Sequence, residues 1–460
     1  MKVSWQWTRA ILITAGTLLL PLLSSGQTPG VTEKEILIGS CAALEGPSSF
    51  LGRETVAGAE AYFQSVNEEG GVNGRKLRLV SYDDGYDPAK TQACWDKLMA
   101  QKVFAMGFFV GTPTAVKYVP LADSNKVPLI GLFTGAQTLY TPLRHWVINV
   151  RASYGDETQE QVDGLWNTLR YKKIGVIYPD DAFGGAVLLG VQNALQKVGG
   201  TTAATASYMR QTNQVAGAID KVKAADPQAV IVVGPSNTVA PIIKEAHAAG
   251  WKPLFVTVSF VGTDDLIQAA GPDAEGMVIT QVVPPYYLTD LKTVALYRRT
   301  LQKYMPAVRP SFVSLEGFVD AMVIVEGLKK AGKDLTREGL IDAVESLHDV
   351  DMGLGPQLKL NYSAKSHKGF EHVLPTIIRG GRAVPVYGLV YRRAECELGD
   401  WRRYSLQNKN RGSADCVFGL VECVVGRAHE RAGFHVLEPH FFAEVFILGK
   451  FVGVDEADHG

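Results

Sequence analysis

Short apolar runs rich in β-branched residues alternate with amphipathic stretches along most of the chain. The first run covers residues 36–39, and residues 54–67 follow it with apolar positions at helical spacing. Strands that alternate with helices are typical of βαβ units in a parallel sheet. The run at 229–233 is apolar at every position, as expected for a strand that is covered on both faces.

The alternation starts afresh after about residue 150, so the pattern predicts two parallel sheets, each with its own helices. Ligands of open α/β sheets bind beyond the carboxyl ends of the strands. We therefore predict an α/β protein with two Rossmann-like, doubly wound lobes that share one cleft.

The N-terminal segment, residues 1–26, departs from this pattern and has the features of a signal peptide. Lys2 and Arg9 precede an apolar run at 10–23, and three small residues follow it. A positive start, a short apolar core and a small-residue exit are typical of export signals. The run spans 14 residues, short of the roughly 20 that a transmembrane helix needs, so an uncleaved anchor is the less favoured alternative. We expect the mature protein in the periplasm.

The C-terminal segment, residues 391–460, shows no such alternation and receives no fold assignment. It contains Cys416, Cys423, His429 and His435, whose spacings match no compact zinc motif. We expect no metal site there and interpret the segment as a tail without an evolved function, such as the product of an altered reading frame.

Composition and motifs narrow the classes of function. The 460 residues carry a formal net charge of −1, whereas nucleic-acid binding usually leaves a basic surface, so we expect no nucleic-acid partner. The chain contains no dinucleotide-binding, P-loop, nucleophile-elbow or zinc-protease motif. We therefore expect no catalytic residues, no cofactor and no enzymatic activity.

The five cysteines include no CxxC pair, and the favoured interpretation is that all five are buried or unpaired thiols. A bridge between Cys41 and Cys94 is the alternative. Cys41 ends the first predicted strand, and Cys94 lies in the helix expected to cross that strand. Such a bridge requires α-carbons within about 7 Å of each other.

Eight short strings follow one another between residues 46 and 318. They are Gly46-Pro47 with Gly52, Asn67 to Gly74, Tyr82-Asp83-Asp84 with Asp87-Pro88, Gly111 to Thr114, Val127-Pro128-Leu129 with Thr134-Gly135-Ala136, Arg151 to Tyr154 with Glu157, Asp181 to Gly184, and Ser314 to Phe318. In this order they make residues 35–386 resemble the branched-chain amino-acid group of type I periplasmic binding proteins. No single string is specific, but the resemblance covers about three-quarters of the chain.

The resemblance implies two lobes joined by three chain crossings, near residues 149–154, 283–285 and 349–356. Lobe 1 would then comprise residues 35–150 and 285–350, and lobe 2 residues 151–284 and 351–390. It also implies that Asp83 and Asp84 lie in a solvated surface turn.

Residues 111–114 have the features of a helix start, with Thr112 at the N-cap and Pro113 in the first turn. The free amides and dipole of a helix start attract anions. Thr134, Gly135 and Ala136 follow the next strand with the same chemistry. We predict that these two loops bind a ligand carboxylate, against the alternative of two ordinary capped turns.

The resemblance implies further ligand contacts on loops of both lobes. In these contacts an aromatic ring would cover the apolar part of the ligand, and a carboxylate would bind its ammonium. The predicted set is Ser48, Ser49, Gly111, Thr112, Thr134, Gly135, Ala136, Tyr154, Asp181, Phe183, Ser236, Ser259, Phe260 and Glu316.

Two positions depart from the leucine-type receptors. Those proteins usually carry an acid near Ser259, which holds the ammonium, and a tyrosine near Ser236. Asp181 or Glu316 would have to replace the missing acid. Otherwise the ligand is a carboxylate without an amine, such as an aromatic or oxo acid.

The resemblance implies an extracytoplasmic substrate-binding protein of an ABC importer. It would capture a branched-chain or other hydrophobic amino acid, or a similar small carboxylate, and deliver it as a monomer to the membrane permease. The alternative is a ligand-sensing receptor domain of the same fold.

Overall fold

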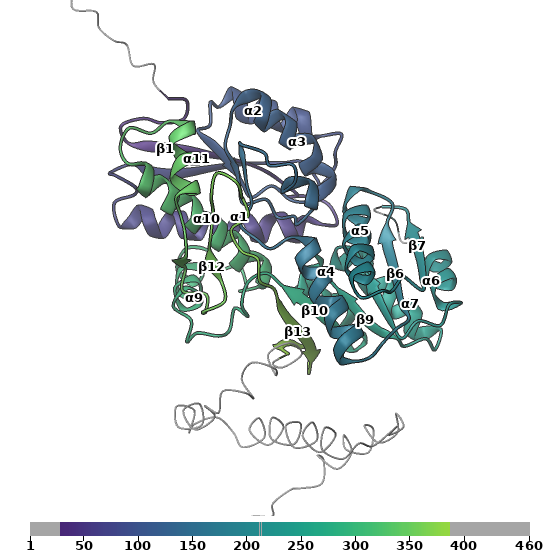
Figure 1. Cartoon of the computed structure of the whole chain (residues 1–460). Helices are drawn as coiled ribbons and strands as arrows, with labels where there is room; N and C mark the ends of the chain where they lie inside the picture. Colours follow the sequence, from purple (N-terminus) through teal and green to yellow (C-terminus); the bar gives the residue numbers. More distant parts are fainter. Residues whose placement is uncertain (1–27, 211, 213, 387–460) are drawn as a thin grey trace, which may run out of the picture. The chain divides into compact units, whose positions relative to one another are not determined.

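The first lobe is built on five parallel strands in the order β2-β1-β3-β4-β5. Figure 1 labels β1 of this sheet, with α2 and α3 beside it. The computed structural model describes residues 28–386 apart from 211 and 213, so the predicted signal peptide and the 391–460 tail lie outside the described residues. The strands are β1 (Glu35–Ala42), β2 (Lys76–Asp83), β3 (Ala105–Gly107), β4 (Leu129–Ile130) and β5 (Val147–Ile148). Strand β1, which lies between β2 and β3, is buried from Ile36 to Ala42, and this explains its apolar sequence.

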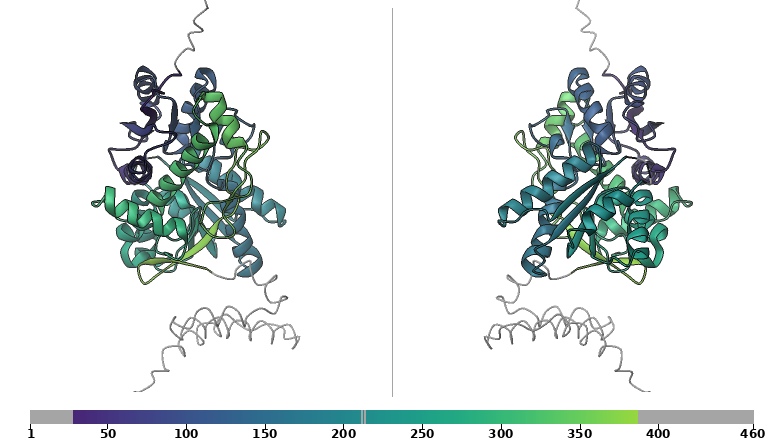
Figure 2. Two further views of the ribbon diagram at one scale, coloured as in Figure 1. Left: turned by 90° about the vertical axis from the view of Figure 1, so that its left-hand side faces the viewer. Right: turned by 90° about the vertical axis from the view of Figure 1, so that its right-hand side faces the viewer.

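Helices from two distant parts of the sequence pack on lobe 1. They are α1 (Ser49–Glu68), α2 (Thr91–Ala100), α3 (Thr112–Asn125), α9 (Lys292–Tyr304), α10 (Phe312–Ala331) and α11 (Arg337–Glu345). Both views of Figure 2 show the green helices that follow residue 290 beside the purple N-terminal segment, as the contacts of α1 with α9 and α10 require.

Helices α1 and α10 lie against each other almost backbone to backbone. A methyl group on Gly58 would lie 1.9 Å from the carbonyl oxygen of Ser314, and one on Gly317 would lie 2.1 Å from that of Thr55. Only glycine at both positions allows this approach. The contact fixes the position of α10 on lobe 1, and with it the position of Glu316.

The second lobe has a seven-stranded sheet in the order β14-β13-β10-β9-β8-β6-β7. Its strands are β6 (Ile174–Pro179), β7 (Ala204–Tyr208), β8 (Ala229–Val232), β9 (Leu254–Thr257), β10 (Val278–Gln281), β13 (Leu374–Arg379) and β14 (Arg382–Pro385). Strands β6 to β10 are parallel, and β13 and β14 add an antiparallel edge. The predicted doubly wound fold of two lobes is confirmed, with this antiparallel addition to the second sheet.

Five α-helices pack on the sheet of lobe 2 within the described residues. They are α4 (Tyr154–Asp163), α5 (Ala182–Lys197), α6 (Ala216–Lys223), α7 (Ser236–Ala248) and α8 (Thr263–Ala270). Helix α4 begins with a capping box in which Ser153 and Asp156 bond reciprocally, and it continues into a π-helical turn at Gly164–Thr168.

The chain returns to lobe 2 later than the expected crossing at 349–356. The short pair β11 (Val350–Asp351) and β12 (Lys359–Leu360) comes first. Residues 367–370 then bond to the end of β5, where the His367 carbonyl accepts from the Asn149 amide and the Phe370 amide donates to Val150. The sheet of lobe 2 resumes only at Leu374. The polar, irregular sequence between β12 and β13 gave no signal of this pairing.

Asp84 does not lie in a solvated turn. Its side chain is buried and accepts hydrogen bonds from the Tyr86 amide at 2.9 Å and from the Tyr118 hydroxyl at 2.8 Å. Burial raises the pKa of Asp84 to about 6 despite these bonds. The expectation of a solvated Asp84 was therefore wrong, and the carboxylate instead holds the loop that presents Tyr86.

Cys41 and Cys94 form a disulfide, with α-carbons 6.1 Å apart. The preference for unpaired thiols was therefore wrong for this pair, although Cys41 and Cys94 do lie on the predicted strand and helix. Cys396, Cys416 and Cys423 lie outside the described residues. None of the helices between residues 28 and 386, the two gaps apart, has the length and apolar character that a bilayer crossing requires.

Replacing both bridged cysteines by alanine should lower the free energy of unfolding by about 2–4 kcal/mol, because the bridge closes a loop across a sequence separation of 53. Denaturant unfolding with and without reductant measures this loss. The parent should lose stability on reduction, and the double variant, Cys41→Ala with Cys94→Ala, should not respond. A parent that is indifferent to reductant would show that the bridge is absent.

Candidate ligand-binding site

The two predicted anion-binding loops of lobe 1 lie side by side. The hydroxyl oxygens of Thr112 and Thr134 share a hydrogen bond of 2.6 Å, and both side chains are buried. The N-cap of α3 is Gly111 and not Thr112, which is the first helical residue. Gly111 has a φ of 90°, which favours glycine, and a methyl group there would lie 1.8 Å from the ring of Tyr86.

A tyrosine ring also lies against the second loop. A methyl group on Gly135 would lie 3.0 Å from ring carbon Cδ1 of Tyr154, and the Tyr154 amide donates to the Gly135 carbonyl at 2.7 Å. Ala136 is buried and caps a short 3-10 turn, Gln137–Leu139. Each glycine of the lobe 1 loops is thus covered by a tyrosine ring, Tyr86 or Tyr154.

Five buried aromatic rings join the two lobes, and we call them the aromatic cluster: Tyr86, Phe133, Tyr154, Phe183 and Phe260. Phe260 of lobe 2 lies 5.5 Å from Phe133 and 5.8 Å from Tyr86, measured between ring centroids. It also lies 4.6 Å from Phe183, which in turn lies 5.3 Å from Tyr154. The predicted lid residues Phe183 and Phe260 therefore meet the loops of lobe 1.

A buried arginine at the first chain crossing holds carboxylates from both lobes. Arg151 Nη2 lies 2.7 Å from Glu157 Oε1 on α4, and Nη1 lies 3.1 Å from Glu316 Oε1 on α10. Its guanidinium also bonds to the Ser259 hydroxyl and lies 5.6 Å from the ring centroid of Phe133. We call Arg151, Glu157, Ser259 and Glu316 the arginine cluster.

Glu157 is the most fully bonded carboxylate of this cluster. Its oxygens accept from the Ser259 amide at 2.8 Å, from the Ser259 hydroxyl at 3.0 Å and from the Thr280 hydroxyl at 2.6 Å, in addition to Arg151. Burial raises the pKa of Glu157, and the Arg151 charge opposes the rise. Burial raises the pKa of Glu316 to about 7, again against Arg151.

Asp181 has a different set of partners. It is the N-cap of α5, where it accepts from the amides of Phe183 at 2.9 Å and Gly184 at 3.0 Å. Its second oxygen lies 2.9 Å from Arg210 Nε. The Arg210 guanidinium lies over the Tyr86 ring, 4.4 Å from its centroid, and donates to the Tyr86 carbonyl, so this pair also links the lobes.

The remaining predicted residues lie at the edge of this region. Ser48 is the buried N-cap of α1, and Ser49 is half-buried. Phe50, next to them, lies against Gly262 beside Phe260. Ser236 is the buried first residue of α7, and no hydrogen bond or ring contact within residues 28–386 joins it to either cluster.

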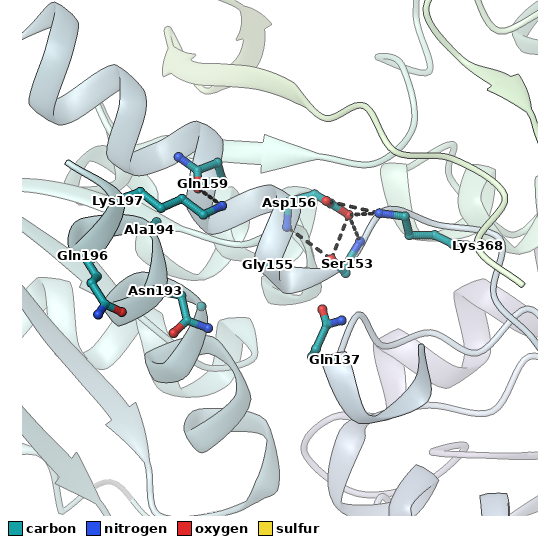
Figure 3. Close-up of a pocket in the computed structure, with 11 residues that line it drawn as sticks. Gln137, Ser153, Gly155, Asp156, Gln159, Asn193, Ala194, Gln196, Lys197 and Lys368 are labelled. Atoms are coloured by element: carbon teal, nitrogen blue, oxygen red, sulfur yellow. Dashed lines mark hydrogen bonds and ion pairs between the residues drawn. The ribbon is translucent and has the colours of Figure 1, made fainter. Parts of the chain in front are cut away.

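A separate hollow of about 570 Å³ lies outside both clusters (Figure 3). Its walls are polar and include Gln137, Asn193, Lys197 and an ion pair between Asp156 and Lys368. None of the predicted ligand contacts lines it. We therefore place the candidate site at the aromatic cluster, where the predicted loops of both lobes meet.

Five residues of the two clusters and their surroundings were not predicted as ligand contacts from the sequence: Tyr86, Phe133, Arg151, Glu157 and Arg210. Arg151 and Glu157 stood in one of the matching strings, and a charged residue at a predicted crossing was the available signal. Tyr86 has a φ of 56°, unusual outside glycine, which no sequence pattern reveals. Within the described part of the chain, no group of three or more His, Cys, Asp or Glu side chains is placed to hold a metal ion.

Comparisons with known proteins agree with this architecture. The family model described as "Periplasmic binding protein" matches residues 35–372. A structure from Rhodopirellula baltica, described as a possible leucine/isoleucine/valine-binding protein, is 32% identical, with a TM-score of 0.74 over 77% of this chain and 96% of that one. A leucine-, isoleucine-, valine-, threonine- and alanine-binding protein of Pseudomonas aeruginosa is 26% identical over 65% of this chain and 79% of its own.

A fatty acid ABC transporter substrate-binding protein from Thermomonospora curvata has the same fold, with 25% identity and a TM-score of 0.71 over 78% of this chain and 93% of its own. Proteins described as binding amino acids and fatty acids thus share this architecture. The family match, the relatives and the two-lobed fold lead to one conclusion: the chain belongs to the type I periplasmic binding proteins, in the group of the leucine/isoleucine/valine-binding proteins.

Proposed function

We propose that this protein is the extracytoplasmic substrate-binding component of an ABC importer, which captures a small apolar carboxylate between its lobes and delivers it to a membrane permease. One observation carries the proposal. The paired threonines of lobe 1 and the aromatic lid of lobe 2 converge on the same place, which neither lobe forms alone. The relatives described as amino-acid or fatty-acid binding proteins support a carboxylate ligand.

The ligand carboxylate docks first on lobe 1. The hydroxyls of Thr112 and Thr134 and the N-terminal amides of α3 surround one point, and the helix dipole favours negative charge there. Lobe 2 then rotates about the chain crossings and brings Phe183 and Phe260 over the apolar part of the ligand. A ligand drives this closure only because it contacts both lobes.

The protein acts as a monomer outside the cytoplasm, and the permease recognises its closed form. The Cys41–Cys94 bridge supports this location, because disulfides persist in oxidising compartments such as the periplasm.

Ligand binding should compact the molecule, because closure brings the two lobes together. A thermal-shift screen of the mature protein against amino acids and simple carboxylates first identifies a ligand. At one hundred times its dissociation constant the ligand should stabilise the fold by about 2.7 kcal/mol. Small-angle scattering should then show a smaller radius of gyration with the ligand than without it. A bound protein of unchanged radius would contradict the closing-lobe mechanism.

Thr112→Val should weaken binding of that ligand at a cost of about 1–3 kcal/mol, because a buried carboxylate loses a donor while the shape of the site is kept. Isothermal titration measures the loss. Thr55→Val is the matched control, since Thr55 also carries a buried helical hydroxyl, bonded to Leu51, on lobe 1. Equal affinity of Thr112→Val and the parent would show that the carboxylate binds elsewhere.

Phe183→Ala should weaken binding mainly through faster dissociation, because the ring that packs between Tyr154 and Phe260 no longer seals the site. Stopped-flow release of the bound ligand measures the rate. Phe183→Leu should restore slow release in large part, as it refills most of the buried volume. An unchanged dissociation rate in Phe183→Ala would exclude Phe183 from the lid.

A further inference from the structure

The buried carboxyl groups around Arg151 outnumber its single positive charge. They belong to Glu157, Glu316 and Asp320. Arg151 is the only cation that acts on Glu316 and Asp320 within the described residues. A buried charge without a partner is costly. The cluster therefore favours a ligand that brings a positive charge and disfavours one that adds only a further negative charge.

Two of the carboxylates that could receive a ligand ammonium are already occupied by the protein. Glu157 accepts from the Thr280 hydroxyl and from both the amide and the hydroxyl of Ser259, in addition to its arginine partner. Asp181 accepts from two amides at the start of α5 and pairs with Arg210. An ammonium would have to displace these partners at either residue.

Glu316 and Asp320 have oxygens to spare. Glu316 is 4% exposed and its Oε1 lies 3.1 Å from Arg151 Nη1, but no hydrogen bond within residues 28–386 engages its Oε2. Asp320 is 1% exposed, and its Oδ2 has no hydrogen-bond partner in the described part of the chain. The two residues are one helical turn apart on α10, so they share one face of the helix.

Both carboxyl groups resist ionisation until a further cation is near. Burial raises the pKa of Glu316 to about 7, against the charge of Arg151. Burial, together with the neighbouring Glu316, raises the pKa of Asp320 well above its ordinary range. A ligand ammonium beside them would oppose both shifts, because an opposite charge favours the ionised form of a carboxyl group.

This pair of acids lies beside the loop that we propose to bind the ligand carboxylate. Asp320 packs on Gly131, where a methyl group would lie 2.6 Å from the β-carbon of Asp320, and Thr134 follows three residues later. The guanidinium bonded to Glu316 lies 5.6 Å from the ring centroid of Phe133, the residue before Thr134. One carbon atom joins the ammonium and the carboxylate of an α-amino acid, so its ammonium needs an acceptor next to this loop.

We propose that Glu316 replaces the acid that is missing near Ser259, that its Oε2 accepts the ammonium of a zwitterionic ligand, and that Asp320 supplies a second negative charge to this acceptor. The inference rests on the proposed function as a carboxylate receptor and names the residues that select among carboxylates. Both charged groups of the ligand then bind lobe 1, and lobe 2 covers them with its aromatic rings.

Matched pairs of compounds that differ only in the α-amine test the proposal by isothermal titration at pH 7.4. The pairs are L-phenylalanine with 3-phenylpropionate and L-leucine with 4-methylpentanoate. The amino acid of the pair that binds should do so at least about tenfold more tightly than its amine-free acid, because the latter adds a buried negative charge without a partner. Amine-free acids that bind as tightly as the amino acids, or more tightly, would overturn the inference and leave the proposed function intact.

The proposed function fails in a different way. L-Phenylalaninamide and L-leucinamide keep the ammonium and lack the carboxylate, and each should bind at least about tenfold more weakly than its amino acid. Equal binding of amide and amino acid would contradict the carboxylate loop. If neither these compounds nor the other common amino acids and their amine-free and 2-oxo counterparts bind, the carboxylate-receptor function itself is contradicted, and the inference falls with it.

Glu316→Gln keeps the size of the side chain and removes its charge. It should lower the affinity for the amino acid at least about tenfold and keep or improve the affinity for the amine-free acid, because only the ammonium loses its partner. The ratio of the two affinities within one variant does not depend on the fraction of protein that is folded. A ratio equal to that of the parent would overturn the proposal.

Asp181→Asn is the matched comparison, because it neutralises the other acid that could replace the missing one. It should change both affinities by the same factor. A selective loss of amino-acid binding in Asp181→Asn, but not in Glu316→Gln, would assign the ammonium to Asp181 and contradict our assignment. Asp320→Asn should reduce the preference for the amino acid at least about threefold, since it removes a nearby charge. An unchanged preference would remove Asp320 from the acceptor.

Discussion

The pairing of Arg151 with Glu157 and Glu316 is the interaction on which the rest of the structure depends. A buried guanidinium needs a carboxylate partner, and removing one member of such a pair costs about 3–5 kcal/mol. Here the partners come from different lobes at the point where the chain first crosses between them. Glu157 is bonded in turn to Thr280 on β10, and Glu316 lies on α10, which packs on α1. One charge therefore ties the sheet of lobe 2 to the helices of lobe 1.

The aromatic cluster follows from the same constraint. Arg151 lies beside Phe133 and Tyr154, so its position sets where these rings stand between the lobes. Phe260 and Phe183 close the cluster from lobe 2, and Tyr86 closes it from lobe 1 with Arg210 stacked on its outer face. Polar anchors thus surround an apolar centre, which is the usual composition of a small-molecule site.

The spacing of apolar residues predicted most strands and helices, because an element buried on one face or on both faces has apolar residues at a characteristic spacing. It placed the N-cap of α3 one residue too late, at Thr112. The N-cap is Gly111, which has a positive φ and lies so close to the ring of Tyr86 that only glycine fits, and no local sequence signal reveals this contact. Arg210 and Tyr86 meet across 124 positions of sequence, and such a pairing has no periodicity to reveal it. The burial of Asp84 and the late return of the chain to lobe 2 were not predicted for the same reason. Each depends on a partner that is distant in the sequence, Tyr118 for Asp84 and β5 for the returning chain.

The close approach of α1 and α10, at Gly58 against Ser314 and at Gly317 against Thr55, has a consequence for the ligand site. Glu316 is the immediate neighbour of Gly317, and no side chain lies between the two helix backbones to absorb a change. Any larger residue at either glycine forces the helices apart and moves Glu316 relative to Arg151. Substitution of either glycine would therefore disturb ligand recognition at a distance, although neither glycine offers a functional group to a ligand.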